Sequence, residues 1–494
     1  MPDARRQSLR RAGLAGVAVL MAGCTTVGPN FTRPDAASAP AGYAMAGDPV
    51  PAGVRLDPDG RVAGPWWTAF GSDALDQTIR LALAQSPDVE RARAVLDRSQ
   101  AAEQAVRGDL GPQLSASADV QRQKFNSKTF GFSGFPSLTF NLWSVGSTVS
   151  YDLDVFGGGR RRAEEAGARA EQAARQADAA YLSLTGSVAL QAIRIAGLRE
   201  QIAAAGVVVE DDRRLLEIAR RAEALGGMSS VELIRMESQL ADDEAVLAPL
   251  QRQYDAARHQ LALLVGKSPA EWSAPDFALA SFSAPAQIPV SAPSSLVRQR
   301  PDILAAEAEL HAATAAVGVA TANQYPDVRL SAKGAFSNPE VGELIDTGST
   351  GWNLFSGVTA PIFDGGARKA RTRAAEADAR AALARYRQTV LQAFTQVSDV
   401  LAALETDRLR LEALERGAEA GARDTASAES AERAGGASRL RALQARRELD
   451  RKQRDLAEAR ARLLSDMAEL YVASAADWRE APAAGGPRGV STGH

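Results

Sequence analysis

The chain is poor in the residue types on which most protein chemistry depends. Its 494 residues include one cysteine, Cys24, and three histidines, His259, His311 and His494. A lone thiol cannot form an internal disulfide, and His259 and His311 lie far apart within helical patterns. No metal site, cofactor or catalytic centre is therefore expected. The phosphate-loop motif (Gly, four residues, Gly, Lys, then Ser or Thr) is also missing, so no nucleotide site is expected.

The chain also has a small net charge and few long apolar segments. A net charge of −3 gives no electrostatic reason to expect nucleic-acid binding. No segment approaches the roughly 20 apolar residues of a membrane-spanning helix. The only compact apolar stretch, 12–23, follows a segment with several arginines. A basic segment, a short apolar core and small residues before a cleavage site make up a secretory signal, so residues 1–23 are predicted to be a signal peptide.

Cys24 stands directly after that signal, in the sequence Met21-Ala22-Gly23-Cys24. This sequence resembles the lipobox of bacterial lipoproteins, Leu-Ala-Gly-Cys, with Met21 in place of the leucine. The resemblance implies that Cys24 is the acylated N-terminus of the mature chain, since several acyl chains anchor a protein firmly. Thr25 follows where inner-membrane retention typically needs aspartate, which favours the outer membrane. The alternative is an incidental apolar residue at the end of the signal.

An internal duplication organises the rest of the chain. Equivalent marks in the two copies lie 214 residues apart at two prolines, 207 apart at a phenylalanine and 209 apart at a glycine pair. Repetition of this kind fixes architecture before any local pattern does. The first-copy marks are Pro87, Pro112, Phe156 and Gly226-Gly227, and their second-copy counterparts are Pro301, Pro326, Phe363 and Gly435-Gly436.

Each copy reads as helix, strand, loop, strand, long helix, turn and long helix. The predicted segments are a lipidated tether (24–65), a first repeat (66–265, with a hairpin at 113–155 and long helices at 158–265), an inter-repeat linker (266–293), a second repeat (294–475, with a hairpin at 327–363 and long helices at 366–473) and a disordered tail (476–494).

Four segments alternate apolar and polar residues with a period of two. They lie at 114–120, 145–153, 328–332 and 352–362. Alternation over about 10 residues is what a transmembrane barrel strand requires, with one side toward lipid and the other toward a wet lumen. A half-buried soluble sheet has the same period and is the alternative. The duplication of the pattern, and the predicted outer-membrane location, favour the barrel.

The long helices are too polar to lie in a membrane. The segment 160–221 is almost free of proline and dense in Ala, Arg, Glu and Gln, and 367–433 repeats it. Roughly 60 residues at 1.5 Å each make a rod of about 90 Å, about three times the hydrocarbon core of a bilayer. The charges require an aqueous surrounding, so these helices are expected to project from the membrane.

Four strands cannot form a membrane barrel alone. Open edges in lipid leave backbone groups unpaired, and bacterial barrels start at eight strands. The chain must therefore oligomerise, with 8, 12 or 16 strands for a dimer, trimer or tetramer. Because each strand pair continues into long helices, the helices are expected to form a second tube coaxial with the barrel.

Four motifs stand out along the chain: Trp66-Trp67-x-x-Phe70, Tyr151-Asp152-Leu153-Asp154-x-Phe156-Gly157, Arg300-Pro301-Asp302 and Pro361-Ile362-Phe363-Asp364-Gly365-Gly366. These motifs resemble those of the outer-membrane efflux factors of the TolC family, closest to the lipidated OprM/NodT-like branch. The resemblance implies an α+β membrane protein: a homotrimer whose 12-stranded β-barrel continues into a 12-helix periplasmic α-barrel. It also implies a passive exit duct that docks onto a periplasmic adaptor and an inner-membrane pump.

The resemblance also assigns a periplasmic aperture. In the family, the last helix opens with a run whose acidic residues ring the closed mouth. Here Arg441 and Gln444 stand where those carboxylates are usual, and Leu443 is available for an apolar constriction. Arg441 is expected to find a counter-charge at Glu232, the duplicated position of the first copy. A local slip of the alignment, or a solvated helix face, is the alternative.

Glycines mark the corners between strand and long helix. Gly157 and Gly158 in the first copy, and Gly365 and Gly366 in the second, are expected to adopt backbone angles that other residues avoid. The run Arg160 to Arg162 that follows the first corner is interpreted as a solvated or phosphate-facing rim.

Two other functions compete with an efflux duct. A lipid-anchored periplasmic coiled-coil scaffold without a pore would use the same helices. A general diffusion porin is disfavoured because roughly half of the chain forms helices that a porin lacks. A passive duct selects little, so the sequence does not identify the transported substrate.

Overall fold

The computed structural model describes residues 26–35, 42–45, 56–57, 65–126, 136–285, 288–289 and 293–475. Its helices are α2 (Asp73–Gln85), α3 (Pro87–Asp109), α4 (Gly158–Ala224), α5 (Ser230–Val265), α6 (Pro293–Gln299), α7 (Pro301–Ala322), α8 (Ala367–Arg433) and α9 (Arg439–Ser474), with short 3-10 helices η2 (Trp66–Phe70), η4 (Leu279–Ser281), η5 (Val341–Glu343) and η6 (Thr347–Ser349). Its strands are β1 (Leu56–Asp57), β2 (Gln113–Phe125), β3 (Leu138–Leu153), β4 (Ile288–Pro289), β5 (Asp327–Asn338) and β6 (Thr350–Thr359).

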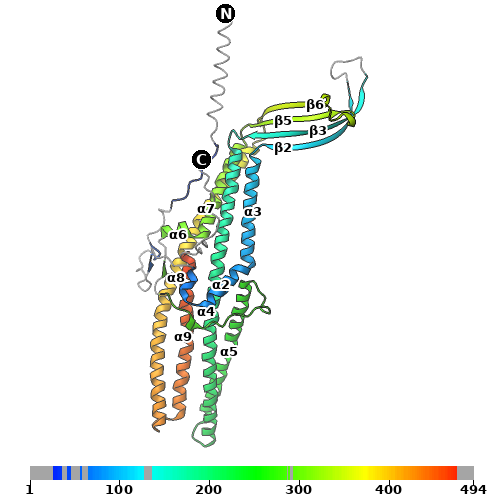
Figure 1. Ribbon diagram of the computed structural model, residues 1–494. Coiled ribbons are helices and arrows are strands. Elements are labelled where there is room, and N and C mark those ends of the chain that lie inside the picture. Colours follow the sequence, from blue (N-terminus) through cyan, green and yellow to red (C-terminus); the bar gives the residue numbers. More distant parts are fainter. Residues whose placement is uncertain are drawn as a thin grey trace. The chain divides into compact units, whose positions relative to one another are not determined.

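The order helix, strand, strand, long helix, long helix is observed in both copies. α7 begins at Pro301, 214 residues after α3 begins at Pro87, and β5 begins the same distance after β2. α4 and α8 each contain 67 residues, and α5 and α9 each contain 36. Within each copy the shorter long helix runs back alongside the longer one (Figure 1).

The described residues form two compact units. Unit 1 comprises residues up to 34, 95–174 and 305–386, and unit 2 comprises 35–94, 175–304 and the residues from 387 onward. Unit 1 therefore contains the strands β2, β3, β5 and β6 with the adjoining ends of α3, α4, α7 and α8. Unit 2 contains α2, α5, α6, α9 and the remainder of those four helices.

The four strands of unit 1 form one antiparallel sheet in the order β2-β3-β5-β6 (Figure 1). β3 pairs with β2 on one side and with β5 of the second copy on the other, so the sheet joins the two copies. In this register Val149 lies opposite Leu114 and Ala332, and Ala332 lies opposite Leu354. The apolar residues of all four strands consequently share one face, as the alternation predicted.

That apolar face is exposed to an unusual degree. Leu114, Trp352 and Leu354 have exposed fractions of 73%, 81% and 73%. Large apolar patches left open on a protein surface mark an interface with a membrane or a partner. The opposite face carries Ser150, Lys333 and similar polar residues.

The strands end earlier than predicted. β3 ends at Leu153 rather than at 155, and β6 ends at Thr359 rather than at 363. Pro361 lacks the backbone N–H that a ladder needs, so the pairing stops before it. Ile362 and Phe363, assigned to the hairpin by the sequence, instead lie beyond the sheet with exposed fractions of 98% and 92%.

The two corners differ in their glycines. Gly157, Gly365 and Gly366 have positive φ angles of 78°, 64° and 86°, as expected for a chain that reverses sharply. The expectation is wrong for Gly158, which is the first residue of α4 and is helical. The second corner has two more residues between its phenylalanine and its helix, and this accounts for the change of spacing from 207 to 209.

Aromatic side chains form the core of unit 2 where the motif Trp66-Trp67-x-x-Phe70 packs against the end of α9. Trp66 stacks on Tyr471 with a centroid distance of 5.6 Å, and Phe70 packs edge-on against the same ring at 6.0 Å. The indole N–H of Trp66 donates to the hydroxyl of Thr185 on α4. These side chains are fully buried, so a motif read from the sequence has a packing role.

One sequence expectation about apolar segments is corrected. α7 is long and apolar enough, by length and composition, to pass for a membrane-spanning helix, and more than half of the relevant segment is buried. Its apolar content is mostly small: Ala305, Ala308, Ala312 and Ala315 are buried in unit 1. A buried core helix meets the same criteria, so this helix is not by itself evidence of a span.

Candidate functional site

The sheet of unit 1 has two open edges. Among the residues that the structure describes, β2 pairs only with β3 and β6 pairs only with β5. Each edge strand thus presents unpaired backbone N–H and C=O groups. β2 has 13 residues and β6 has 10, which is enough to cross a hydrocarbon core when tilted. In lipid, both edges need a partner strand.

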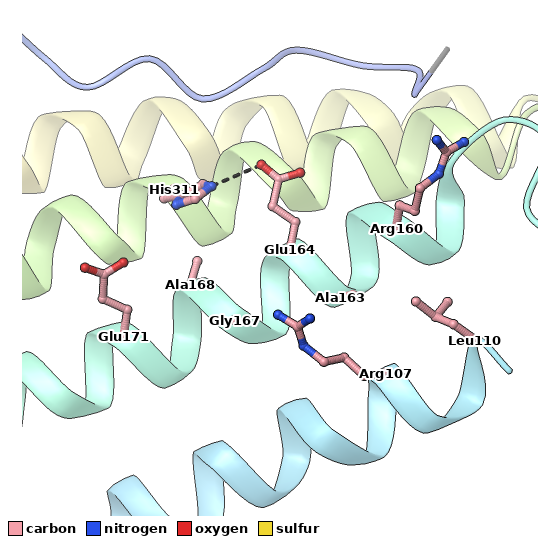
Figure 2. Close-up of a pocket in the computed structure, with 9 residues that line it drawn as sticks. All are labelled: Arg107, Leu110, Arg160, Ala163, Glu164, Gly167, Ala168, Glu171 and His311. Carbon is pink, nitrogen blue, oxygen red and sulfur yellow. Dashed lines mark hydrogen bonds and ion pairs between the residues drawn. The ribbon is translucent and has the colours of Figure 1, made fainter. Parts of the chain in front are cut away.

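A groove lies directly after the strands, between the ends of α3 and α4. Its volume is about 430 Å³. Figure 2 shows Arg107 of α3, Leu110 just after that helix, six residues of α4 and His311 of α7 around it. Arg107 pairs with Glu103 at 2.8 Å, and Arg160 pairs with Asp154 at 3.3 Å. Because these charges already have partners, the groove offers a ligand little to bind and is read as part of the packing below the sheet.

Beside the groove, α4 and α7 hold the segment that begins at Thr26. Arg161 of α4 is 3% exposed. Its guanidinium donates to the carbonyl of Val27 at 3.2 Å and to the side-chain oxygen of Asn30 at 2.6 Å. The ring of Phe31 stacks on His311 at 4.4 Å. The interpretation of Arg161 as part of a solvated rim is therefore wrong, because this side chain is the clamp for the N-terminal segment.

Glu164 links the two sides of this clamp. Its carboxylate accepts from Arg161 at 2.7 Å and from the Nε2 of His311 at 3.0 Å, the contact drawn in Figure 2. Burial raises the pKa of Glu164, but the hydrogen bonds from Arg161 and His311 outweigh burial and lower it. The ionised carboxylate thereby orients both partners toward the segment that follows Cys24. Cys24 itself, the predicted lipidation site, lies outside the described residues.

In unit 2, the turns between the long helices hold the residues assigned to the aperture. Ser229 and Glu232 form a capping box at the start of α5, which satisfies orphan N–H groups of the helix. The guanidinium of Arg441 donates to Asp424 of α8 at 2.6 Å. Within one chain the counter-charge of Arg441 is therefore Asp424, whereas Glu232 serves its own helix.

The neighbours of Arg441 also differ from expectation. Leu443 is 9% exposed and is buried within the chain, so in a single protomer its side chain does not face an opening. Gln444 is exposed on α9. Near Leu443 in the sequence, Ala442 and Ala445 of α9 form a small buried core with Ala428 of α8.

Unit 2 also contains a buried charge junction where α4, α5 and α9 meet. Arg447 of α9 lies 2.5 Å from Asp212 of α4 and 2.9 Å from Asp243 of α5. Arg451, one turn later, reaches Asp243 at 2.5 Å. Asp212 and Asp243 are 5% and 7% exposed. Buried charges persist only when paired in this way, and the junction ties the last helix to the first long pair.

The two aspartates of the junction titrate in opposite directions. Burial and the hydrogen bond with Asp243 raise the pKa of Asp212 to about 7. Burial also raises the pKa of Asp243, but hydrogen bonds from Asp212, Arg447 and Arg451 outweigh it and lower the value to about 2. Two carboxyl groups in contact share a proton, so near neutral pH this pair lies close to a change of charge.

Sequence reasoning missed this junction. Its arginines lie more than 200 residues after its aspartates, as the contact between Arg451 and Asp243 illustrates. The local signal is weak: each aspartate of the junction belongs to a pair of adjacent aspartates, Asp211-Asp212 in α4 and Asp242-Asp243 in α5. Among the described residues, no group of three or more His, Cys, Asp or Glu side chains is placed to hold a metal ion.

Comparisons with known proteins agree with this geometry. The family model described as outer membrane efflux protein matches residues 78–267 and 292–476, which is most of the chain and both copies of the repeat. The fusaric acid resistance protein FusA of Burkholderia cepacia is 30% identical over 381 residues, covering 76% of this chain and 71% of that protein.

Two further relatives cover nearly the whole chain. Nodulation protein T of Rhizobium leguminosarum bv. trifolii is 27% identical over 464 residues, 92% of this chain and 93% of that protein. The solved structure of the outer-membrane channel OprN superposes with a TM-score of 0.81 at 27% identity and covers 92% of this chain and 100% of that chain. The similarity therefore extends across both units.

Proposed function

This chain belongs to the outer membrane efflux protein family, and from that premise we propose that three copies of it close into one continuous exit duct. It is an outer-membrane channel component of an efflux system and extends into the periplasm. The duct performs no chemical step on what passes through it. Substrates are delivered to it by an inner-membrane pump through a periplasmic adaptor protein.

The open sheet with an exposed apolar face carries the proposal. Its apolar side chains face outward on all four strands, and its polar side chains share the other face. An apolar exterior with a polar interior is the pattern of a transmembrane barrel. Four strands per copy give 12 in a homotrimer, which closes the edges of β2 and β6 against neighbouring copies. The long helices supply the periplasmic α-barrel, 12 helices in all.

A lipid anchor at Cys24 is part of the proposal. The sequence Met21-Ala22-Gly23-Cys24 supports it, as does the clamp of Arg161 and His311 on residues 27–31. Mass spectrometry of the mature protein should find residues 1–23 removed and Cys24 triacylated. An unmodified thiol would exclude the anchor without affecting the barrel.

The aperture is proposed to lie at the turns that contain Arg441, Gln444 and Glu232. A ring of three Arg441 side chains makes the mouth less acidic than that of relatives with carboxylates there. Arg441→Asp should therefore increase the inhibition of conductance by trivalent cations. If the variant and the original chain are blocked equally, Arg441 does not line the mouth.

Conductance of the purified protein in a planar bilayer tests the duct directly. We expect single-channel openings and a trimer by light scattering in detergent. The competing function, a lipid-anchored scaffold without a pore, predicts membrane association without conductance. A dimer or tetramer that conducts would retain the pore but replace the 12 strands by 8 or 16.

A further inference from the structure

The two copies of the repeat differ in how much of their surface is covered. At the first corner, Phe156 stacks on Tyr325 at 4.7 Å, just before β5 begins. At the second corner, the equivalent Phe363 is 92% exposed and Ile362 is 98% exposed. The side of the first copy that meets the second copy is therefore packed, whereas the matching side of the second copy is bare.

Contacts inside the chain give a template for what covers the bare side. β3 pairs with β5 so that Tyr151 lies opposite Leu330 and Val149 opposite Ala332. Moved by the repeat spacing of 207, the β3 residues become Val358 and Ser356 of β6. Moved by 214, the β5 residues become Ala116 and Ala118 of β2. The template therefore sets Val358 opposite Ala116 and Ser356 opposite Ala118 of the next copy.

This register passes an independent check. The observed pairings place Ser356 on the face of Leu330, and Ala118 on the face of Val145. Both belong to the exposed apolar face of the sheet. A slip of one residue would turn one copy's apolar face to the opposite side of the sheet. The spacings of 207 and 214 are set by phenylalanines and prolines outside the strands, so the agreement of the two faces is independent of them.

Three contacts between α4 and α7 give a second template, this time for the helices. A Cβ on Gly158 would lie 3.1 Å from the Cβ of Ala322, and one on Gly318 would lie 2.7 Å from the Cδ of Arg161. Glu164 accepts from His311 at 3.0 Å. The first contact joins two small residues, the second places a large side chain over a glycine, and the third pairs an acidic residue with a basic one.

When these contacts are shifted along the sequence by the repeat spacings, each kind of complementarity is retained. The α4 residues become residues of α8, 209 positions later, and the α7 residues become residues of α3, 214 positions earlier. The first translated pair again joins two small residues. In the second pair the larger residue now lies on the α3 side, and in the third the basic residue lies on α8 and the acidic one on α3. The translated pairs are Ala367 with Gly108, Ala370 with Gln104, and Arg373 with Asp97.

All six translated residues are exposed in the single chain. A Cβ on Gly108 would meet open space. Among the ion pairs of the described residues, neither Asp97 nor Arg373 takes part in one. The residues of α4 and α7 from which they were translated, in contrast, are buried or half-buried. Surfaces that match in size and charge but remain uncovered are what a head-to-tail interface requires.

We propose that β6 and α8 bind β2 and α3 of a second copy of this chain in the register by which β3 and α4 bind β5 and α7 within one copy, with Arg373 paired to Asp97. The inference rests on the proposed trimer and specifies its seam. Phe363 then covers Gly111 and Pro112 of the next copy, as Phe156 covers Tyr325. A heterologous interface of this kind closes into a ring when repeated.

Cysteine crosslinking tests the register. Ser356→Cys combined with Ala118→Cys should yield disulfide-linked oligomers on a non-reducing gel after a mild oxidant is added. Within one chain the two positions are separated by the full width of the sheet, so they cannot bridge internally. The matched controls combine Ser356→Cys with Ala116→Cys or with Val120→Cys, two positions to either side, and should link at least tenfold less.

A charge exchange tests the ion pair without cysteines. Arg373→Asp alone and Asp97→Arg alone should each lower the temperature at which the trimer dissociates in detergent, and the double variant should restore it. Arg371→Asp, two residues earlier on the same helix, is the control and should leave the trimer unchanged. A merely structural role for Asp97 or Arg373 would not produce rescue by the double variant.

The outcomes separate this inference from the proposed function. If the unaltered chain is not a trimer, the proposed function itself fails. If it is a trimer but links through Ala116→Cys or Val120→Cys instead, the register is overturned and the trimer stands. If the charge variants behave independently, with no restoration, Arg373 and Asp97 do not meet across the seam.

Discussion

The sheet of unit 1 exposes apolar side chains, whereas the charge junction of unit 2 buries charged ones. The sheet leaves Trp352 and Leu354 almost fully exposed, whereas the junction buries Asp212 and Asp243 at 5% and 7% exposure. Apolar exposure is stable only where the surrounding medium is itself apolar, and buried charge is stable only where partners are fixed. The contrast therefore supports the proposal that the sheet faces lipid, whereas the junction joins α4, α5 and α9 within a bundle of polar helices.

Removal of the central arginine of the junction should have the largest effect. Arg447→Met leaves Asp212 and Asp243 buried without their shared partner, and breaking such a pair costs about 3–5 kcal/mol. The loss should appear as a lower midpoint of thermal unfolding, followed by circular dichroism at 222 nm. Arg446→Met is the matched control, because Arg446 is 53% exposed and lies 3.6 Å from Asp211. Equal midpoints for the two variants would mean that the junction is not a joint.

A charge on the apolar face of the sheet should have the next largest effect. Val149→Arg places a guanidinium toward lipid, at a cost of about 2–4 kcal/mol near the middle of the membrane. The amount of folded protein recovered from the outer membrane should fall accordingly. Ser150→Arg, one residue later on the polar face, should assemble normally. If the two variants assemble alike, the sheet has no lipid-facing side.

The pH dependence of stability should show a smaller effect, with a defined sign. Because the pKa of Asp212 is raised to about 7, its contribution is complete below the unfolded value near 4 and is lost as the pH rises through 7. Asp243, with its pKa lowered to about 2, contributes above pH 4 and loses this contribution only in strong acid. Between pH 5 and 8 the unfolding midpoint should decrease, by an amount equivalent to about 1 kcal/mol.

Asp212→Asn removes the titrating group and should flatten this slope. The same measurement on Asp424→Asn serves as the control, since Asp424 lies in the exposed pair with Arg441. A slope that survives in Asp212→Asn would assign the pH dependence to other carboxyl groups, such as Asp466, whose pKa burial and contact with Asp407 raise to about 7.

Thiol labelling should distinguish the two faces of the sheet with almost no effect on stability. Cysteines at Ser150 or Lys333 should react with a membrane-impermeant reagent in intact outer membranes. Cysteines at Val149 or Leu330 should be shielded by lipid. The labelled fraction, read by a mass shift on a gel, should differ several-fold between the faces, and equal labelling at all four positions would contradict the barrel.

Local signals in the sequence were sufficient for the helices and the sheet. Ser72, Ser229 and Ser438 each accept a hydrogen bond from the backbone N–H three residues later and so cap α2, α5 and α9. Such caps depend only on near neighbours in the sequence. The alternation of apolar residues likewise determined which face of each strand is which, since the period of two leaves no freedom.

The parts that sequence reasoning missed depend on distant neighbours. Leu443 was predicted to be available for an apolar constriction, but its side chain is buried within the chain. Glu232 was predicted to be the counter-charge of Arg441, but within the chain its carboxylate accepts hydrogen bonds from the backbone N–H and the hydroxyl of Ser229. Arg161 reads as rim, yet the segment at Val27 converts it into a clamp. In each case the residue type was informative about chemistry, and only tertiary packing determined its partner.

The pairing of β3 with β5 has a consequence for synthesis. Between Leu153 and Asp327 the ribosome must add the whole of α4, α5, α6 and α7, so the first hairpin exists long before the strand that completes its inner edge. Contacts this distant in sequence form slowly. During the delay the hairpin displays both an unpaired edge and a row of exposed apolar side chains, the combination that favours aggregation. Until β5 pairs with β3, the first hairpin therefore remains the part of the sheet most open to contacts with other chains.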